Sequence, residues 1–190
     1  REAVKELNRL GILIDISHCG TKTATDIMEA SKYSVAFTHA IPSKLVEMGA
    51  RAKSDELLQA LGEKGGVVGQ MIWSPFCERR DKMGIRPTLD DFVELLAHMA
   101  NVAGVEHVGL GLDAVPFFTE EFYSEWAKGF GPLMRPHKTP TFEEKYVAGF
   151  NDITDMPKIT QKLLKHGYSE EETRKIMGEN WVSLLSKVWK

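Results

Sequence analysis

The sequence predicts an α/β fold with about four parallel strands and outer helices, the arrangement of half of a (β/α)8 TIM barrel. Short apolar segments rich in β-branched residues alternate along the chain with longer segments whose apolar residues recur at helical spacing. Nearly continuous apolar runs are typical of parallel strands that are covered on both faces. Two of these runs, 12–17 and 34–38, are each followed directly by a histidine, His18 and His39.

The first βαβ unit is predicted within residues 3–39. An amphipathic helix over 3–10 ends at Gly11, a residue suited to the left-handed conformation that closes helices. A strand over 12–17, a helix over 20–31 and a strand over 34–38 follow.

Two further helix–strand pairs continue the alternation. Ser54 and Thr88 are suitable N-cap residues for two amphipathic helices, and each helix is followed by a glycine and an apolar run. The predicted elements are helices over 54–64 and 88–103, strands over 67–73 and 108–112, and helices over 154–166, 169–177 and 181–189. The last three helices are expected to form an outer helical layer.

The segment 114–151 breaks this regularity. It is rich in proline, glycine and aromatic residues and is too long for a plain connector. We expect it to form a lid or an interface loop within a single partial domain that spans 1–190. His137 in this segment is a candidate for facing substrate, although loop histidines are commonly just solvated.

Composition indicates a globular enzyme domain and argues against several other classes. The chain has 190 residues, of which 43% are hydrophobic and 27% charged, and a net charge of −3. This charge provides no field that would attract nucleic acid or an anionic membrane. No apolar run is long enough to span a bilayer, and no secretory signal opens the chain. The sequence leaves the location unknown, with a cytoplasmic one favoured. Because the chain opens with Arg1 inside a helical pattern, we expect that an N-terminal portion is missing.

The two cysteines, Cys19 and Cys77, are too few for a disulfide scaffold or a cysteine-rich zinc module, although a single bridge stays open. Cys19 lies beside His18, but no dedicated base accompanies it as a nucleophile would require.

The polar residues that follow the predicted strands indicate a metal site. His18, His39 and Asp113, which follows the strand over 108–112, are expected at the same edge of the sheet, because the carboxyl ends of parallel strands gather catalytic groups. One histidine at a strand end is more often structural, but two in equivalent positions favour metal ligation. Asp15 lies within the first strand and could orient a ligand histidine from a second shell, or be a buried structural aspartate.

Five segments follow one another along the chain: Leu13-Ile14-Asp15-Ile16-Ser17-His18, Phe37-Thr38-His39, Gly65-Gly66-Val67-Val68-Gly69, Gly109-Leu110-Gly111-Leu112-Asp113 and Gly178-Glu179-Asn180-Trp181. In this order they resemble the C-terminal half of the membrane (renal-type) dipeptidases, peptidase family M19 of the amidohydrolase-like metal-dependent hydrolases. The resemblance extends over nearly the whole chain.

The resemblance implies a zinc-dependent dipeptidase that hydrolyses the peptide bond of a dipeptide through a metal-activated hydroxide. His18 and His39 match ligands of the second Zn²⁺ in a binuclear centre, and Asp113 matches the carboxylate that handles a proton. Arg51 matches the arginine that binds the free carboxylate of the substrate, the alternative being a solvated loop residue. The resemblance thus implies that the enzyme is a hydrolase and that the reaction is proteolysis.

The family's zinc centre also uses an early His-x-Asp pair and a bridging carboxylate, and the chain contains no His-x-Asp pair. The isolated chain is therefore expected to need the N-terminal half of the barrel or a second chain, in a homo-oligomer, and to be inactive alone. Two alternatives stay open: an amidohydrolase acting on a non-peptide amide, and a non-catalytic half-barrel fragment or subunit.

Overall fold

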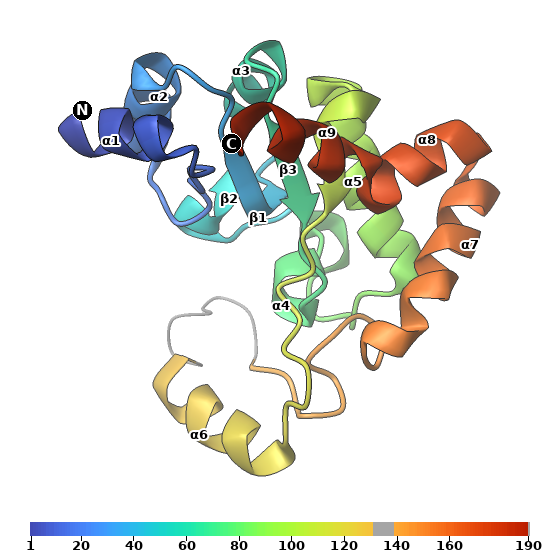
Figure 1. Ribbon diagram of the computed structural model, residues 1–190. Coiled ribbons are helices and arrows are strands. Elements are labelled where there is room, and N and C mark those ends of the chain that lie inside the picture. The colour runs from blue at the N-terminus through green and yellow to red at the C-terminus, as the bar shows by residue number, and fades with distance from the viewer. Residues whose placement is uncertain (131–138, 190) are drawn as a thin grey trace.

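The computed structural model describes residues 1–130 and 139–189, which form a parallel sheet flanked by helices (Figure 1). Within these residues the sheet has four strands in the order β2-β1-β3-β4, all parallel. The strands are β1 (Ala36–Pro42), β2 (Ala52–Lys53), β3 (Val67–Gln70) and β4 (Val108–Leu110). The α-helices are α1 (Glu2–Leu10), α2 (Thr21–Ala30), α3 (Asp55–Glu63), α4 (Ser74–Cys77), α5 (Leu89–Ala103), α6 (Glu120–Phe130), α7 (Met156–His166), α8 (Glu170–Arg174) and α9 (Asn180–Val188). The predicted α/β class and parallel sheet are confirmed.

The helices begin and end where their capping residues predict. Gly11 closes α1 in the left-handed conformation, at φ 69°. Thr88 and Asp91 form a capping box at the start of α5, in which the Thr88 side chain accepts from the Asp91 amide and the Asp91 carboxylate accepts from the Thr88 amide. Ser169 and Glu172 form a second capping box, at the start of α8.

The prediction of a regular strand over 12–17 is wrong. This segment runs beside β1 but makes only one bridge with it, between Asp15 and Ala36. The ladder stops there because the amide of Thr38, on β1, donates to the Asp15 carboxylate over 3.1 Å. A side chain has taken a hydrogen bond that a regular ladder would give to a backbone carbonyl.

β1 is longer than predicted, and His39 lies within it rather than after its end. The register to β3 shifts by one residue, since Phe37 pairs with Val68 but Ala40 pairs with Gln70. Thr38 and His39 together therefore oppose Gly69, as in a β-bulge, which redirects side chains locally. β3 and β4 both end earlier than predicted, at Gln70 and Leu110.

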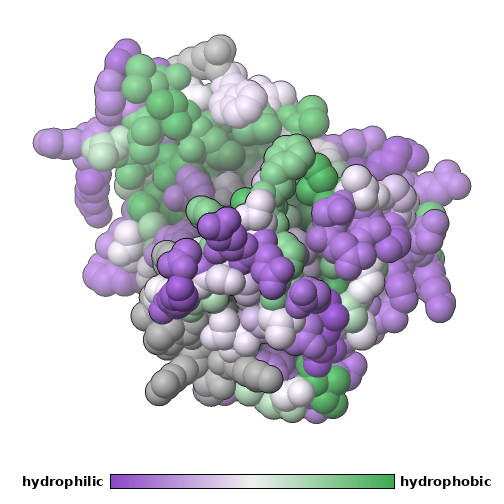
Figure 2. Space-filling view, turned by 90° about the horizontal axis from the view of Figure 1, so that it is seen from below, coloured by the Kyte–Doolittle hydropathy of each residue, from purple (hydrophilic) through white to green (hydrophobic). Residues whose placement is uncertain are grey.

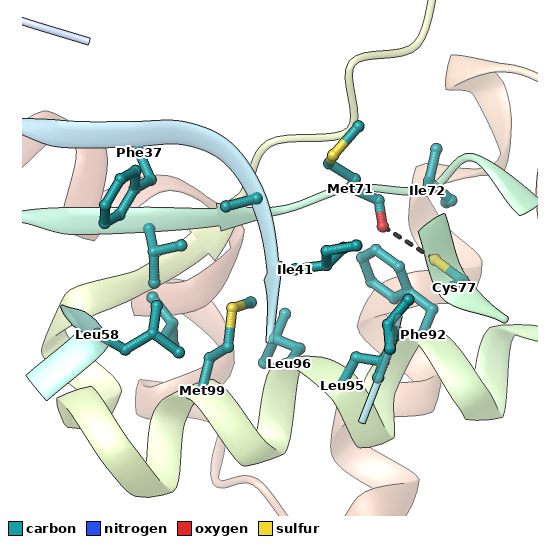
Figure 3. Packing of buried hydrophobic residues seen from close by; sticks show 14 of the residues in the cluster. Phe37, Ile41, Leu58, Met71, Ile72, Cys77, Phe92, Leu95, Leu96 and Met99 are labelled. Atoms are coloured by element: carbon teal, nitrogen blue, oxygen red, sulfur yellow. Dashed lines mark hydrogen bonds between the residues drawn. The ribbon is translucent and has the colours of Figure 1, made fainter. Parts of the chain in front are cut away.

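The main core lies between the sheet and the layer of α3 and α5. Phe37 and Val68 are fully buried there with apolar side chains from both helices. Figure 3 shows this packing, with Phe37 near Leu58 and Met99. Cys77 is buried in the same core, and its thiol donates to the carbonyl of Met71 over 3.2 Å (Figure 3).

Both cysteines are free, so the single bridge left open by the sequence does not form. Burial raises the pKa of the Cys77 thiol far above its ordinary value.

α9 departs from the expected outer helical layer. Ala36 and Val67, which alternate in β1 and β3 with the core residues Phe37 and Val68, pack against Leu184 and Val188 of α9. α9 thus covers the opposite face of the sheet, whereas α7 lies beside α5 (Figure 1). Leu184 and Val188 of α9 thus cover the small side chains of Ala36 and Val67 at the start of β1 and β3.

The outer edge of β4 is closed by side chains. Asn180 Nδ2 donates to the carbonyls of Val105 (2.8 Å) and Val108 (2.7 Å). Trp181 Nε1 donates to the carbonyl of Leu110 over 3.0 Å. These donors replace the strand that would otherwise pair at this edge.

The segment 114–151 contains a helix, α6, that the irregular composition did not predict. Thr119 accepts from the amide of Phe122, and Glu120 and Glu121 lie in the first turn, where acidic residues favour a helix start. His137 lies outside the described residues. Among those described, no helix is both long and apolar enough to cross a bilayer.

Seen from the end where α6 lies, the surface is unevenly divided (Figure 2). Hydrophobic residues gather on the left, the side of α1 and β1 in Figure 1, and hydrophilic residues dominate on the right. Two exposed hydrophobic residues, Leu10 and Ile12, lie where α1 leads into the segment beside β1. Apolar surface of this kind is typical of a contact with another chain or segment.

We predict that Gly111→Ala destabilises the protein by about 2–3 kcal/mol, because an added methyl overpacks a closed site. A Cβ at Gly111 would lie 1.9 Å from the Thr38 carbonyl oxygen and 2.7 Å from Gly69 Cα. Thermal unfolding measures the loss. The matched control is Gly129→Ala on α6, where a Cβ meets nothing within 4 Å and stability should rise by up to about 1 kcal/mol. Equal effects of the two variants would contradict this packing.

Candidate functional site

Four of the five predicted site residues converge at the carboxyl ends of the strands. His18 follows the segment beside β1, His39 lies in the bulge of β1, and Arg51 ends the 3-10 turn Gly49–Arg51 that leads into β2. Asp113 lies three residues after β4. These positions are 95 residues apart in sequence at most, yet Arg51 contacts both His18 and Asp113.

The two histidines face one another through the same ring atom. His18 Nε2 and His39 Nε2 are 2.9 Å apart, with the ring planes 67° to each other. Burial, and then the charge of Arg51, lower the pKa of His18. Burial also lowers the pKa of His39. Both imidazoles are therefore held in the neutral form, which is the form that binds a metal.

Asp15 does not contact the ring of His39 directly, because the hydroxyl group of Thr38 links the two side chains. The Thr38 hydroxyl donates to Asp15 Oδ2 over 2.6 Å and lies 2.9 Å from His39 Nδ1. Because that hydroxyl has one hydrogen, its bond to the carboxylate leaves it to accept from His39 Nδ1–H. The proton of His39 is thereby fixed on Nδ1, and Nε2 keeps its lone pair for a ligand.

Ser17 completes this network. Its hydroxyl donates to Asp15 Oδ1 over 2.5 Å and accepts from the backbone amide of His39 over 3.1 Å. Burial raises the pKa of Asp15, but hydrogen bonds from Ser17 and Thr38 outweigh it and leave that pKa below its ordinary value. The carboxylate is charged and fully engaged, so the structural role and the orienting role foreseen for Asp15 coincide.

Ser17 and Thr38 were not among the residues predicted for the site. The available signal was their position, since a hydroxyl residue directly precedes each histidine. Hydroxyl residues are common at strand ends, which is why this signal did not single them out.

Arg51 is held inside the site and is not a solvated loop residue. Its side chain is 24% exposed. Nη1 lies 2.7 Å from His18 Nδ1, Nη2 lies 3.8 Å from Asp113 Oδ2, and the guanidinium lies over the ring of Phe76 at 5.4 Å. Burial lowers its pKa, but an arginine stays charged throughout the physiological range.

Asp113 has an unusual backbone. Its φ is 55°, in the left-handed region that few residues other than glycine adopt. Its carbonyl accepts from Trp73 Nε1 over 2.6 Å. The carboxylate itself is 44% exposed and faces Arg51, so it is accessible to a ligand.

The donor set fits a metal ion only in part. Two imidazole nitrogens bound to one tetrahedral Zn²⁺ lie about 3.3 Å apart, close to the 2.9 Å between His18 Nε2 and His39 Nε2. Among the described residues, however, no three His, Cys, Asp or Glu side chains form a group that could hold a metal. His98 and His107 lie elsewhere, bonded to Asp55 and to the Gly66 carbonyl, as expected of structural residues.

The chain is similar in sequence to known proteins along its whole length. Residues 1–123 match the family model described as membrane dipeptidase (Peptidase family M19). The chain is 37% identical to an uncharacterized dipeptidase of Schizosaccharomyces pombe, over 100% of this chain and 38% of that protein. It is 26% identical to dipeptidase tcpJ of Claviceps purpurea, over 99% of this chain and 37% of that protein. The chain thus spans little more than a third of these curated relatives.

Two solved structures are also similar to this chain in sequence and in fold. An amidohydrolase from Pseudomonas aeruginosa is 35% identical with a TM-score of 0.82, over 99% of this chain and 56% of that one. A metallo peptidase from Rhodobacter sphaeroides, liganded with a phosphinate mimic of the dipeptide L-Ala-D-Ala, is 25% identical with a TM-score of 0.77, over 99% of this chain and 46% of that one.

We predict that Thr38→Val lowers zinc affinity about 10- to 100-fold, the usual cost of losing an outer partner of a ligand. The variant removes the hydroxyl that joins Asp15 to His39 Nδ1 and keeps the shape of the side chain. Competition with a chromophoric chelator measures the affinity. Thr154→Val is the matched control, because its hydroxyl also donates to a carboxylate, that of Asp152, but on an exposed turn. A Thr38→Val protein that binds zinc as tightly as the Thr154→Val protein would contradict the role of this hydroxyl.

We predict that the metal-free protein loses stability as the pH falls below about 6.5, the ordinary histidine pKa. His18 and His39 have lowered pKa values in the folded state. Above pH 6.5 both states hold these rings neutral, whereas below it the unfolded state takes up protons first. Denaturant unfolding between pH 7.5 and 5 measures the slope. The double variant His18→Gln/His39→Gln should flatten it, and an unchanged slope would mean that other groups cause the effect.

Proposed function

Because the chain belongs to the membrane dipeptidase family, peptidase family M19, we propose that it provides one half of the active site of a zinc-dependent dipeptidase. The observation that supports this best is the convergence of the paired Nε2 atoms of His18 and His39 with Arg51 and Asp113. A neutral pair of imidazoles, a guanidinium and an accessible carboxylate are the groups that hydrolysis of a small peptide needs.

In this proposal His18 and His39 hold a zinc ion. When bound, zinc polarises the scissile carbonyl and increases the acidity of water. The Thr38 hydroxyl keeps the proton of His39 on Nδ1, away from the ligand atom. Burial of both rings and the charge of Arg51 lower the pKa of both imidazoles, so the rings are neutral at neutral pH. Arg51 Nη1 lies 2.6 Å from His18 Nε2 and would have to move from that atom when zinc binds.

Arg51 binds the free carboxylate of the dipeptide. A planar guanidinium can form two parallel hydrogen bonds with a carboxylate, and the carboxylate that Arg51 faces, that of Asp113, is 3.8 Å away, a loose ion pair. Substrate binding would therefore replace a weak contact with a strong one. The same contact keeps the guanidinium near the strand ends before substrate arrives.

Asp113 moves the proton. Its carboxylate accepts a proton from the attacking water and donates it to the nitrogen of the leaving amine. The 44% exposure of the side chain gives room for a water molecule and for substrate. Hydrolysis then releases two amino acids.

The remaining ligands are proposed to come from outside this chain. No group of three potential ligands occurs among the described residues, and the chain spans about half or less of the solved structures that it resembles. The exposed Leu10 and Ile12 beside the open edge of the sheet give an apolar surface for such a contact. The partner is the N-terminal half of the barrel or a second copy of the chain.

A second candidate is hydrolysis of a non-peptide amide, since one similar structure is that of an amidohydrolase. The metal chemistry is the same, and the two differ in the group that Arg51 binds. A dipeptide has a free carboxylate, whereas a neutral amide substrate has none.

We predict that His18→Ala and His39→Ala each lower zinc affinity by more than about 100-fold and abolish dipeptide hydrolysis, because each removes a direct ligand rather than an outer partner. Zinc content is measured by elemental analysis after mild chelation and reloading, and hydrolysis is measured with a panel of dipeptides and neutral amides in the presence of any partner required. His98→Ala is the control, since His98 lies on α5 and bonds to Asp55.

Equal zinc affinities of the three variants would remove the basis for the site. Hydrolysis of neutral amides but not of dipeptides would favour the second candidate. Two tightly held ions in the isolated chain would contradict the proposal that ligands come from outside it.

A further inference from the structure

The backbone at Asp113 adopts a conformation that must be held by its surroundings. A residue other than glycine in the left-handed region costs of order 1 kcal/mol or more, although aspartate tolerates it better than most. The φ of Asp113 is 55°. Backbone bonding to the β3 side continues beyond β4 only as far as the carbonyl of Leu112, which accepts from the Ile72 amide over 3.2 Å. The sheet therefore holds the N-terminal side of Asp113 and not its C-terminal side.

Two aromatic side chains hold the peptide groups around Asp113. Trp73 Nε1 donates to the Asp113 carbonyl over 2.6 Å. The Tyr146 hydroxyl accepts from the backbone amide of Val115 over 3.0 Å. The turn is therefore bonded at the carbonyl of the aspartate and at the amide two residues later, and these bonds fix the C-terminal side of the strained residue.

The two aromatic residues are themselves fixed. Trp73 is 4% exposed and Tyr146 is 2% exposed. They pair in an antiparallel bridge and their rings are 5.2 Å apart at 74°, an edge-to-face contact. The Ser74 hydroxyl lies 2.5 Å from the carbonyl oxygen of Glu144 and 2.7 Å from that of Tyr146, and its single hydrogen is shared between them, which joins the two backbones further.

We propose that Trp73 and Tyr146 are positioning residues, which together hold the Asp113 carboxylate where it can exchange a proton with substrate. This inference rests on the proposed function. A displacement of about 1 Å of a reacting group can lower the rate on the order of 100-fold, and a strained turn without these two bonds is free to relax by that much. The segment that includes Tyr146 thus acts on the chemistry through the backbone of Asp113.

The test compares Trp73→Phe and Tyr146→Phe with the wild-type protein, loaded with zinc and supplied with any partner needed for hydrolysis. Tyr146→Phe keeps the ring and removes one hydrogen bond, whereas Trp73→Phe keeps an aromatic side chain but removes the indole N–H together with part of the ring. We expect kcat to fall about 10- to 100-fold while KM changes by less than about twofold, because Arg51 and the metal ligands are untouched. Trp181→Phe is the matched control: it also removes an indole bond to a backbone carbonyl near β4, that of Leu110, and should leave kcat unchanged.

A second measurement tests the geometry without activity. In ¹H–¹⁵N spectra the indole N–H of Trp73, assigned by its loss in Trp73→Phe, should exchange with solvent far more slowly than that of Trp189, which is 61% exposed. Fast exchange at Trp73 would overturn the proposal. So would an unchanged kcat in Trp73→Phe and Tyr146→Phe, or an equal loss in Trp181→Phe, while wild-type hydrolysis stood. Absence of hydrolysis by the wild-type protein would instead overturn the proposed function, and this role with it.

Discussion

The extra residue in β1 is the constraint on which the site depends. Thr38 and His39 occupy the space opposite a single residue of β3, Gly69. The Thr38 carbonyl then projects so close to Gly69 and Gly111 that neither has room for a side chain. Because of this bulge, the hydroxyl of Thr38 and the ring of His39 both lie at the same edge of the sheet. Without the bulge, alternation along the strand would direct one of them to the opposite face.

The negative charge of Asp15 is balanced by hydrogen bonds from neutral amide and hydroxyl groups rather than by an ion pair. The Asp15 carboxylate accepts from Ser17 and Thr38, and the nearest ion pair, between Arg51 and Asp113, is long at 3.8 Å. A negative charge that is satisfied by neutral donors does not need a cation beside it. Asp15 therefore needs no ion pair with Arg51, and the N–H donors of Arg51 remain directed at the site.

The sequence was sufficient to predict the order of helices and parallel strands, because capping residues such as Thr88 and Asp91 and the continuous apolar runs depend on local physics. It also predicted that His18 and His39 would meet, since equivalent strand ends lie together. It could not predict the bulge at His39, because one added residue leaves the apolar pattern nearly unchanged. The roles of Trp73 and Tyr146 depend on contacts between segments 31 to 73 residues apart, which no local pattern encodes. The irregular segment beside β1 was mistaken for a strand because its apolar residues are those of a strand, whereas the Asp15 side chain had replaced a ladder bond.

The closure of β4 by Asn180 and Trp181 gives the sheet two unlike edges. One edge has the carbonyls of Val108 and Leu110 occupied, and in the described part of the chain the other edge is β2, with the segment around Asp15 beside the start of β1. An added strand would have to displace these two side chains before it could pair at β4. That requirement disfavours open fibres built through the strands, since a fibre of identical copies needs both edges of every copy.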